Sequence, residues 1–295
     1  MGCTSSVASI DPTFPKTISP TYVVPMEHGD DGRLPSKMST ESYFHTKYMI
    51  GKKLGVGAFA QVYTVRQARH GDHGDEAVKI IDQRMKVNDE TVDMVDDDVR
   101  DAVMCEVDIL KRVSLWDPCI KMIDAFVDGP CSYIVMEKCD FTLLRALDLE
   151  PELTEVSLAD ILRQVLASLC CIHAVDVVHR DVKPDNFLMK NGVVKLCDFG
   201  MSDVLDKRNP TLSGIFGTAP YMSPEMLNND PYDTKTDVWS FACMAHVLLL
   251  GKFPYQPTSA NSKAMKAAIL LGKPTPDFLP ARSLPPVSPY SESYY

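Results

Sequence analysis

The order of the strand and helix patterns along the chain limits the fold more than any other sequence feature. Four short apolar segments predict strands: 48–54, 61–66, 76–81 and 133–137. Three longer segments, in which apolar residues recur every three or four positions, predict helices: 95–113, 157–173 and 236–250. Because the strands come mostly first and the helices later, we expect an α+β fold with a small β-rich lobe followed by a larger helical lobe.

Composition and charge indicate a soluble, cytoplasmic protein. The 295 residues are 45% hydrophobic and 24% charged, which is typical of one large globular domain or two small ones. The net charge of −10 argues against a nucleic-acid partner. The nine cysteines form no CxxC pair, which favours reduced thiols over a zinc site or a disulfide scaffold. The longest apolar run, at 242–250, is far shorter than the roughly 20 residues that span a bilayer.

The two ends of the chain differ in composition from its middle. Residues 1–44 contain many prolines and hydroxyl residues without a periodic apolar pattern, and residues 274–295 are similar. Such segments bury too little apolar surface to offset the entropy cost of folding. We therefore predict a disordered leader and a proline-rich disordered tail around a folded body at 48–273.

A glycine-rich segment lies between the first two predicted strands. Gly55 and Gly57 carry no Cβ, so backbone N–H groups there can approach phosphates closely, and Ala60 takes the place of a third glycine. The strand that follows argues against a dinucleotide-binding crossover, whose glycines open a helix. A hairpin without a ligand is the alternative. Lys79 lies in the third predicted strand, where an ordinary surface lysine is the alternative.

Three oxygen-bearing side chains follow in the second half of the chain. Asp181, Asn186 and Asp198 can supply one base and two ligands for a hard cation. A solvated turn would explain any one of them. All three together, after a glycine loop and a strand lysine, indicate a site for a nucleotide and a metal ion.

In their order and spacing these motifs resemble the eukaryotic protein-kinase family. The resemblance rests on Leu54–Val62, Ala77–Ile80, His179–Asn186, Asp198–Gly200 and Gly217–Glu225. It covers about residues 48–273. It implies a two-lobed fold, with an N-lobe of about 48–138, a C-lobe of about 140–273, and ATP with Mg²⁺ in the cleft between them.

The resemblance also implies a role for each site residue. The implied catalytic residues are Asp181 as the base for the substrate hydroxyl, together with Lys183, Lys79, Glu106, Asn186 and Asp198. The implied ATP-binding residues are Leu54, Gly55, Val56, Gly57, Ala58, Phe59, Ala60, Gln61, Val62, Ala77, Lys79, Glu137, Cys139 and Leu188. The implied Mg²⁺ ligands are Asn186 and Asp198. Glu106 is expected to pair with Lys79.

Two residues resemble those of the serine/threonine branch of the family. Lys183 lies two positions after Asp181, and the hydroxyl of Thr218 can contact both. The implied reaction is transfer of the γ-phosphoryl group of Mg-ATP to a serine or threonine of a protein substrate. The segments 185–188 and 217–222 look most like those of the calcium- and calmodulin-regulated group.

Two features depart from the family pattern. The interval between Lys79 and Glu106 is longer than usual and acidic. We interpret it as a solvated loop, with docking of a basic regulatory partner as the alternative. The glutamate that resembles Glu225 normally pairs with a late arginine, but Arg282 comes too early for that position. We therefore expect the C-lobe to be truncated at its C-terminal end.

The second departure leaves other functions open. One is a kinase-like nucleotide-binding or scaffold module with little or no turnover. Another is an incomplete gene product. The complete set of Lys79, Asp181, Asn186 and Asp198 favours the active enzyme, since a binding module has little need of all four.

Arg180 suggests one form of regulation. It precedes the implied catalytic base, and kinases with an arginine there often respond to phosphate on the activation segment. Thr211 and Ser213 are the candidate acceptors, and solvated loop hydroxyls are the alternative. A phosphate there could pair with Arg180.

The first residues predict a membrane anchor. Met1-Gly2-Cys3-Thr4-Ser5-Ser6 fits the N-myristoylation pattern at Gly2, and Cys3 could carry a palmitoyl chain. Two acyl chains together give stable attachment, whereas one myristoyl chain does not. A chance match to a short pattern is the alternative.

Overall fold

The computed structural model describes most of the chain between its two ends. The described residues are 43–57, 60–68, 76–87, 90–150, 154–257, 259 and 261–279. Several predicted features lie outside them: the acylation site at Gly2 and Cys3, the loop residues Ala58 and Phe59, and Arg282.

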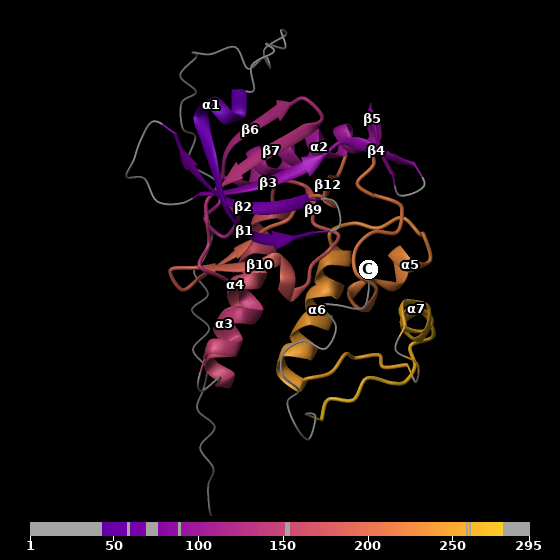
Figure 1. Ribbon diagram of the computed structural model, residues 1–295. Coiled ribbons are helices and arrows are strands. Elements are labelled where there is room, and N and C mark those ends of the chain that lie inside the picture. The colour runs from indigo at the N-terminus through magenta and orange to yellow at the C-terminus, as the bar shows by residue number, and fades with distance from the viewer. Residues whose placement is uncertain are drawn as a thin grey trace, which may run out of the picture. The chain divides into compact units, whose positions relative to one another are not determined.

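A five-stranded antiparallel sheet forms the first lobe (Figure 1). Its strand order is β1-β2-β3-β7-β6, with bounds β1 (Tyr48–Val56), β2 (Ala60–Gln67), β3 (Glu76–Asp82), β6 (Met122–Asp128) and β7 (Cys131–Met136). β3 and β7 are central, which explains why their apolar residues run almost without interruption. Three of the four predicted strands are slightly longer than expected, and β7 starts two residues earlier and ends one earlier.

The folded body begins earlier than residue 48. Helix α1 (Tyr43–Lys47) places Phe44, which is fully buried, against the rings of Tyr48 and Tyr133. Burial of one phenylalanine contributes roughly 1.5–3 kcal/mol, enough to hold a short helix that has little stability of its own. The expectation that the leader extends to residue 44 is therefore wrong at its last two residues.

The acidic interval before Glu106 is structured and not simply a loop. It forms the hairpin β4 (Arg84–Val87) and β5 (Glu90–Val95), and then the start of helix α2 (Asp97–Val113). Asp96 caps this helix, because its carboxylate accepts hydrogen bonds from the backbone N–H groups of Asp98 and Val99. Acidic residues are stabilising in the first turn of a helix, so part of this charge serves α2 itself.

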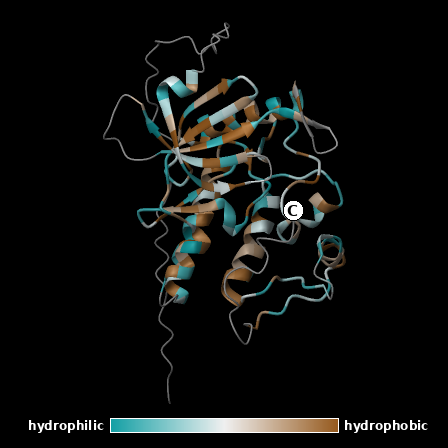
Figure 2. Cartoon of the chain, viewed as in Figure 1, coloured by the Kyte–Doolittle hydropathy of each residue, from teal (hydrophilic) through white to brown (hydrophobic). Residues whose placement is uncertain are grey.

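The second lobe is mainly helical. It contains α3 (Leu143–Leu149), α4 (Glu155–His173), the short α5 (Pro224–Leu227), α6 (Lys235–Leu250) and α7 (Ser262–Leu271). In Figure 2, the brown of hydrophobic residues marks β3, β7 and the last turns of α6. Val165 and Leu169 of α4 and Met244 of α6 are buried in one core that also includes residues of the first lobe. The predicted two-lobed α+β fold is thus confirmed.

Two small sheets complete this lobe. One joins β8 (Phe141–Thr142), β10 (Phe187–Lys190) and β11 (Val193–Leu196), and the other pairs β9 (Val177–Val178) with β12 (Asp203–Val204). Their strands are too short for an alternating pattern to be recognised in the sequence. The loops that follow β9 and β11 carry Asp181 and Asp198, so these sheets position the site.

Helix α4 is long and apolar enough to cross a bilayer by length and composition alone. Its face with Leu158, Leu162, Val165 and Leu169 is buried in the core, and its capping box at Thr154 and Ser157 is that of an ordinary helix start. It is therefore built as the core helix of a globular domain.

The last described residues contact the helical lobe. Helix α7 follows α6 and begins at the Asn261 cap. After it, Lys252 donates to Asp277 at 2.7 Å, and the ring of Phe278 lies 5.7 Å from that of His246. The described part of the expected tail thus has defined contacts. The expected truncation of the C-lobe concerns residues after 279 and stays a prediction.

Candidate active site

A cleft of about 1990 Å³ is lined by residues of both lobes. The site residues expected from the sequence that line it are Leu54, Gly55, Val56, Gly57, Ala60, Val62, Ala77, Lys79, Glu106, Glu137, Cys139, Asp181, Lys183, Asn186, Leu188 and Asp198. Segments far apart in the chain therefore meet at one cavity. Gln61 lies in β2 beside them and is exposed, and it does not line the cavity.

The glycine loop leaves room for a ligand. A Cβ added at Gly55 would meet no described atom within 4 Å, and one at Gly57 would meet only the Ala60 carbonyl oxygen at 3.7 Å. Internal packing therefore does not explain these glycines. The N–H of Gly57 donates to that carbonyl at 2.8 Å, which closes the turn between β1 and β2. Close approach of a bound group to the backbone is one physical reason for glycine at these positions.

Lys79 forms ion pairs with two carboxylates. Its ammonium lies 2.7 Å from Glu106 of α2 and 2.8 Å from Asp198. Burial alone would lower the pKa of Lys79, but the two carboxylates raise it well above its usual value. Burial raises the pKa of Glu106. Lys79 is thus a permanent positive charge on the cleft wall, as the binding of phosphate oxygens requires.

The segment between the lobes offers backbone groups to the cleft. Among the described residues, the carbonyl of Glu137 and the N–H of Cys139 have no hydrogen-bond partner, and both residues line the cavity. Leu188 and Met136 line the same cavity with apolar side chains. The unpaired carbonyl and N–H can form hydrogen bonds with the edge of a planar heterocycle, and the apolar side chains can pack on its faces.

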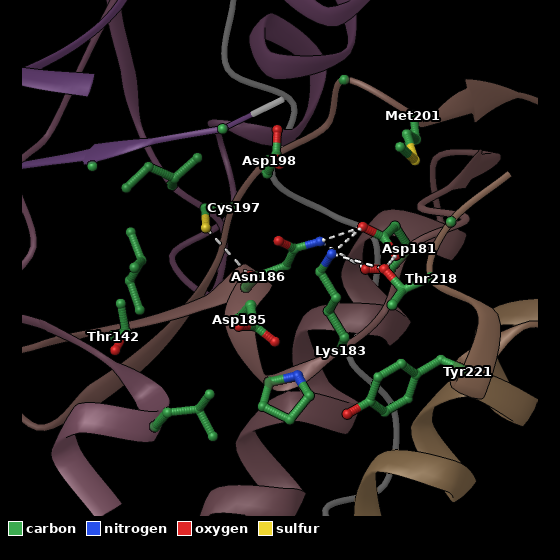
Figure 3. A pocket seen from close by; sticks show the side chains of 18 of the residues that line it. Thr142, Asp181, Lys183, Asp185, Asn186, Cys197, Asp198, Met201, Thr218 and Tyr221 are labelled. Carbon is green, nitrogen blue, oxygen red and sulfur yellow. Dashed lines mark hydrogen bonds and ion pairs between the residues drawn. The ribbon is translucent and has the colours of Figure 1, made fainter. Parts of the chain in front are cut away.

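Three side chains converge on Asp181, as Figure 3 shows. Asn186 donates to Asp181 Oδ2 at 3.1 Å, Thr218 donates to Oδ1 at 2.8 Å, and Lys183 Nζ lies 3.0 Å from Oδ2. Lys183 also donates to the Thr218 hydroxyl at 2.8 Å. The side chain of Asp181 is only 7% exposed, so these contacts fix the orientation of the carboxylate toward the cleft.

Thr218 reaches Asp181 only because glycine precedes it. Gly217 has φ +92°, and a Cβ there would lie 2.4 Å from the carbonyl oxygen of Arg180. Both the backbone conformation and the close approach therefore require glycine at this position. The close approach brings the segment with Thr218 against the loop with Asp181.

Asp237 of α6 supports the same loop, a role that the sequence reasoning missed. Its buried carboxylate accepts hydrogen bonds from the backbone N–H groups of His179 and Arg180 at 2.8 and 2.9 Å. It also lies 2.8 Å from His173 Nε2. Arg180 has a left-handed φ of +68°, which is unfavourable for arginine and needs such support.

Arg180 is already surrounded by partners. Its guanidinium donates to the carbonyl oxygens of Met201 and Ser202, lies 3.4 Å from Asp203, and sits 4.0 Å from the ring centre of Phe216. Among the described residues, no hydrogen bond joins Arg180 to Thr211 or Ser213, the two hydroxyl residues predicted to carry phosphate.

The residues present fit a nucleotide with a divalent cation. Lys79 supplies the positive charge, the glycine loop supplies space, and Asn186 with Asp198 supply oxygen atoms. The described residues hold no cluster of three or more His, Cys, Asp or Glu side chains able to bind a metal. Asn186 and Asp198 would hold a Mg²⁺ ion here, and the ion would supply positive charge beside the phosphates.

Comparison with known proteins gives a consistent answer. The protein kinase domain model matches residues 48–285. CDPK-related kinase 4 of Arabidopsis thaliana is 30% identical over 275 residues, which are 89% of this chain and 44% of that protein.

Two further relatives carry similar names. Calcium/calmodulin-dependent serine/threonine-protein kinase 1 of Oryza sativa subsp. japonica is 32% identical over 81% of this chain and 40% of its own length. CDPK-related protein kinase of Daucus carota is 34% identical over 72% of this chain and 35% of its own length. The chain thus spans less than half of each of these three relatives. It belongs to the protein kinase family, with similarity to calcium-dependent serine/threonine kinases.

Proposed function

We propose that this chain transfers the γ-phosphoryl group of Mg-ATP to serine or threonine hydroxyls of a protein substrate. One observation carries the proposal: Asn186, Lys183 and Thr218 all contact the carboxylate of Asp181 at the edge of the cleft. A carboxylate oriented by three polar neighbours is suited to accept the proton of a substrate hydroxyl. The names of the relatives support this reading for their own kinase domains.

Each residue has a defined task in this reaction. Lys79 would hold phosphate oxygens, while Glu106 keeps its ammonium in place. Asn186 and Asp198 would hold Mg²⁺, which neutralises charge on the phosphates when bound. Lys183 lies beside Asp181 and Thr218, where a positive charge can stabilise the phosphoryl group that meets the hydroxyl.

The pairing of Lys183 with Thr218 supports serine and threonine as acceptors. Their hydrogen bond fills the space directly beside Asp181 and links the two segments that border it. A serine or threonine hydroxyl also lies closer to the substrate main chain, and so to the segments around Asp181, than a tyrosine hydroxyl does.

Incubation of the purified chain with labelled Mg-ATP and a mixed pool of serine, threonine and tyrosine peptides tests the proposal. We expect labelled phosphoserine and phosphothreonine. The control is Asp160→Asn, which removes an exposed carboxylate paired with Arg163 on α4, far from any site residue in sequence. Wild-type protein that binds nucleotide but labels no peptide would instead support the binding-module interpretation.

A further inference from the structure

The side chain of Glu137, a residue that lines the cleft, lies in a largely buried cluster of charges. Its carboxylate is 10% exposed and accepts hydrogen bonds from Lys190 Nζ at 2.6 Å and from the backbone N–H of Lys121 at 2.9 Å. Lys195 Nζ lies 3.7 Å away and is 6% exposed. Two lysines and one amide thus surround one carboxylate.

The lysines of this cluster lie in the hairpin β10–β11, which also carries Leu188, a residue that lines the cleft. Lys190 is in β10, two residues after Leu188, which lines the cavity. Lys195 is in β11 and pairs directly with Leu188 across the sheet. Side chains two apart in a strand share a face. A shift of the strand that carries Leu188 would therefore move these ammonium groups as well.

The other end of the connecting segment is fastened to the same hairpin. The N–H of Asp140 donates to the carbonyl oxygen of Met189 at 2.8 Å, and the Asp140 carboxylate accepts from the N–H of Asn191 at 2.8 Å. Residues 137–140 are therefore tied to β10 at both ends. The tie at Asp140 is mainly backbone, whereas the tie at Glu137 depends on one side chain.

A second acid holds Lys195 from the opposite side. Its ammonium donates to the carbonyl oxygen of Asp117 and lies 3.2 Å from the Asp117 carboxylate. Lys195 is therefore satisfied without drawing Glu137 away from Lys190. Burial opposes ionisation of Glu137, but Lys190, the Lys121 amide and Lys195 together lower its pKa. The cluster is a fixed set of charges at neutral pH.

We propose that the Glu137 carboxylate, through Lys190 and Lys195, is a positioning group for the nucleobase end of the site. It sets the distance between the unpaired backbone groups of Glu137 and Cys139 and the apolar floor at Leu188. A flat base needs both a polar edge and a slot of fixed height, and this cluster joins the two. The inference rests on the proposed function only for the identity of the nucleotide.

Two substitutions test the cluster. Glu137→Gln keeps the shape of the side chain and removes its charge, and Lys190→Met keeps the apolar stem and removes the ammonium. We expect each to raise the KM for ATP about tenfold, as loss of one charge-assisted hydrogen bond would, with kcat and the peptide KM changed less than about twofold. Lys190→Arg keeps the charge and should restore most of the affinity.

Inhibition constants for adenosine and for Mg-tripolyphosphate separate positioning from a general loss of structure. In both variants adenosine should bind about tenfold more weakly, while tripolyphosphate should bind as it does to wild type. Equal weakening of both probes, or unchanged adenosine binding in Lys190→Met, would overturn the inference. Lys190 is 32% exposed, so its replacement leaves a foldable protein even if Glu137→Gln does not.

The matched control is Asp160→Asn, at an exposed carboxylate that also pairs with a basic side chain. It should leave both inhibition constants unchanged. Wild-type protein that binds adenosine but transfers no phosphate would contradict the proposed function. The binding of adenosine to the variants would still test the role of Glu137.

Discussion

Lys79 and Glu106 lie 2.7 Å apart, although the chain between them forms an additional hairpin. The hairpin β4–β5 follows β3 and leads into α2, and the Lys79–Glu106 pair forms with this hairpin in place. The pair links the strand that faces the cleft to the helix behind it.

Glu106→Gln should weaken catalysis by disturbing the position of Lys79. Removal of one partner from a buried ion pair typically costs about 3–5 kcal/mol, and part of this loss falls on the position of Lys79. We expect kcat/KM for ATP to fall at least about 100-fold, which corresponds to roughly 2.7 kcal/mol. The control is Asp108→Asn on the same helix, which is exposed and pairs with Lys111. Steady-state kinetics with unchanged kcat/KM in Glu106→Gln would contradict the role of the pair.

Activity should not require phosphate on the activation segment. The guanidinium of Arg180 already contacts the Asp203 carboxylate and the Phe216 ring. Asp203 therefore supplies the negative charge that a phosphate would otherwise provide. We expect phosphatase-treated protein and the double variant Thr211→Ala/Ser213→Ala to retain wild-type kcat within about twofold, whereas Asp203→Asn should lower it severalfold. The activity of each form would be measured after mass spectrometry of its phosphate content. An inactive dephosphorylated protein would instead support the phosphate expectation.

Cys139 should be alkylated slowly at neutral pH and be protected by nucleotide. Burial first, and the nearby Glu137 carboxylate second, raise the pKa of Cys139 to about 11. The thiolate is the reactive form, so the alkylation rate should rise about tenfold per pH unit from pH 7 to 10. ATP should slow the reaction, while labelling of the exposed Cys170 should not respond to ATP. Peptide mass spectrometry after iodoacetamide treatment measures both, and equal protection of the two thiols would argue against a local effect.

Sequence periodicity predicts the longer elements well. Helices α4 and α6 differ from their expected bounds by one or two residues, because α4 presents a repeated apolar face and α6 is a long, mostly apolar segment. Helix α1 has five residues and one buried ring, so its burial depends on a sheet face that the local sequence does not describe. The β4–β5 hairpin was also missed, since its strands are short and carry charged residues among the apolar ones.

The site shows the same limit. The positions of Lys79, Asp181 and Asp198 could be proposed from motifs, because their types and spacing carry the chemistry. The support from Asp237 could not, since its bonds to His179 and Arg180 join parts of the chain that are 58 and 57 positions apart. Such contacts follow from the packing of α6 under the loop and leave no local pattern.

The leader should attach the protein to a membrane if Gly2 and Cys3 are acylated. Two acyl chains give stable binding, whereas one gives only marginal binding. We therefore expect wild-type protein in the membrane fraction of a eukaryotic cell, and Gly2→Ala and Cys3→Ser in the soluble fraction. Ser5→Ala is the control within the same leader. Equal solubility of all four proteins would show that the pattern is a chance match.

Asp181→Asn tests the central claim most directly, because it removes the proposed base and keeps the size of the side chain. Nucleotide binding and phosphoryl transfer would be measured on the same sample with Mg-ATP and a serine peptide. We predict that the dissociation constant for Mg-ATP changes less than about threefold, while the transfer rate falls at least about 100-fold. A variant that binds Mg-ATP and transfers phosphate at the wild-type rate would contradict the account.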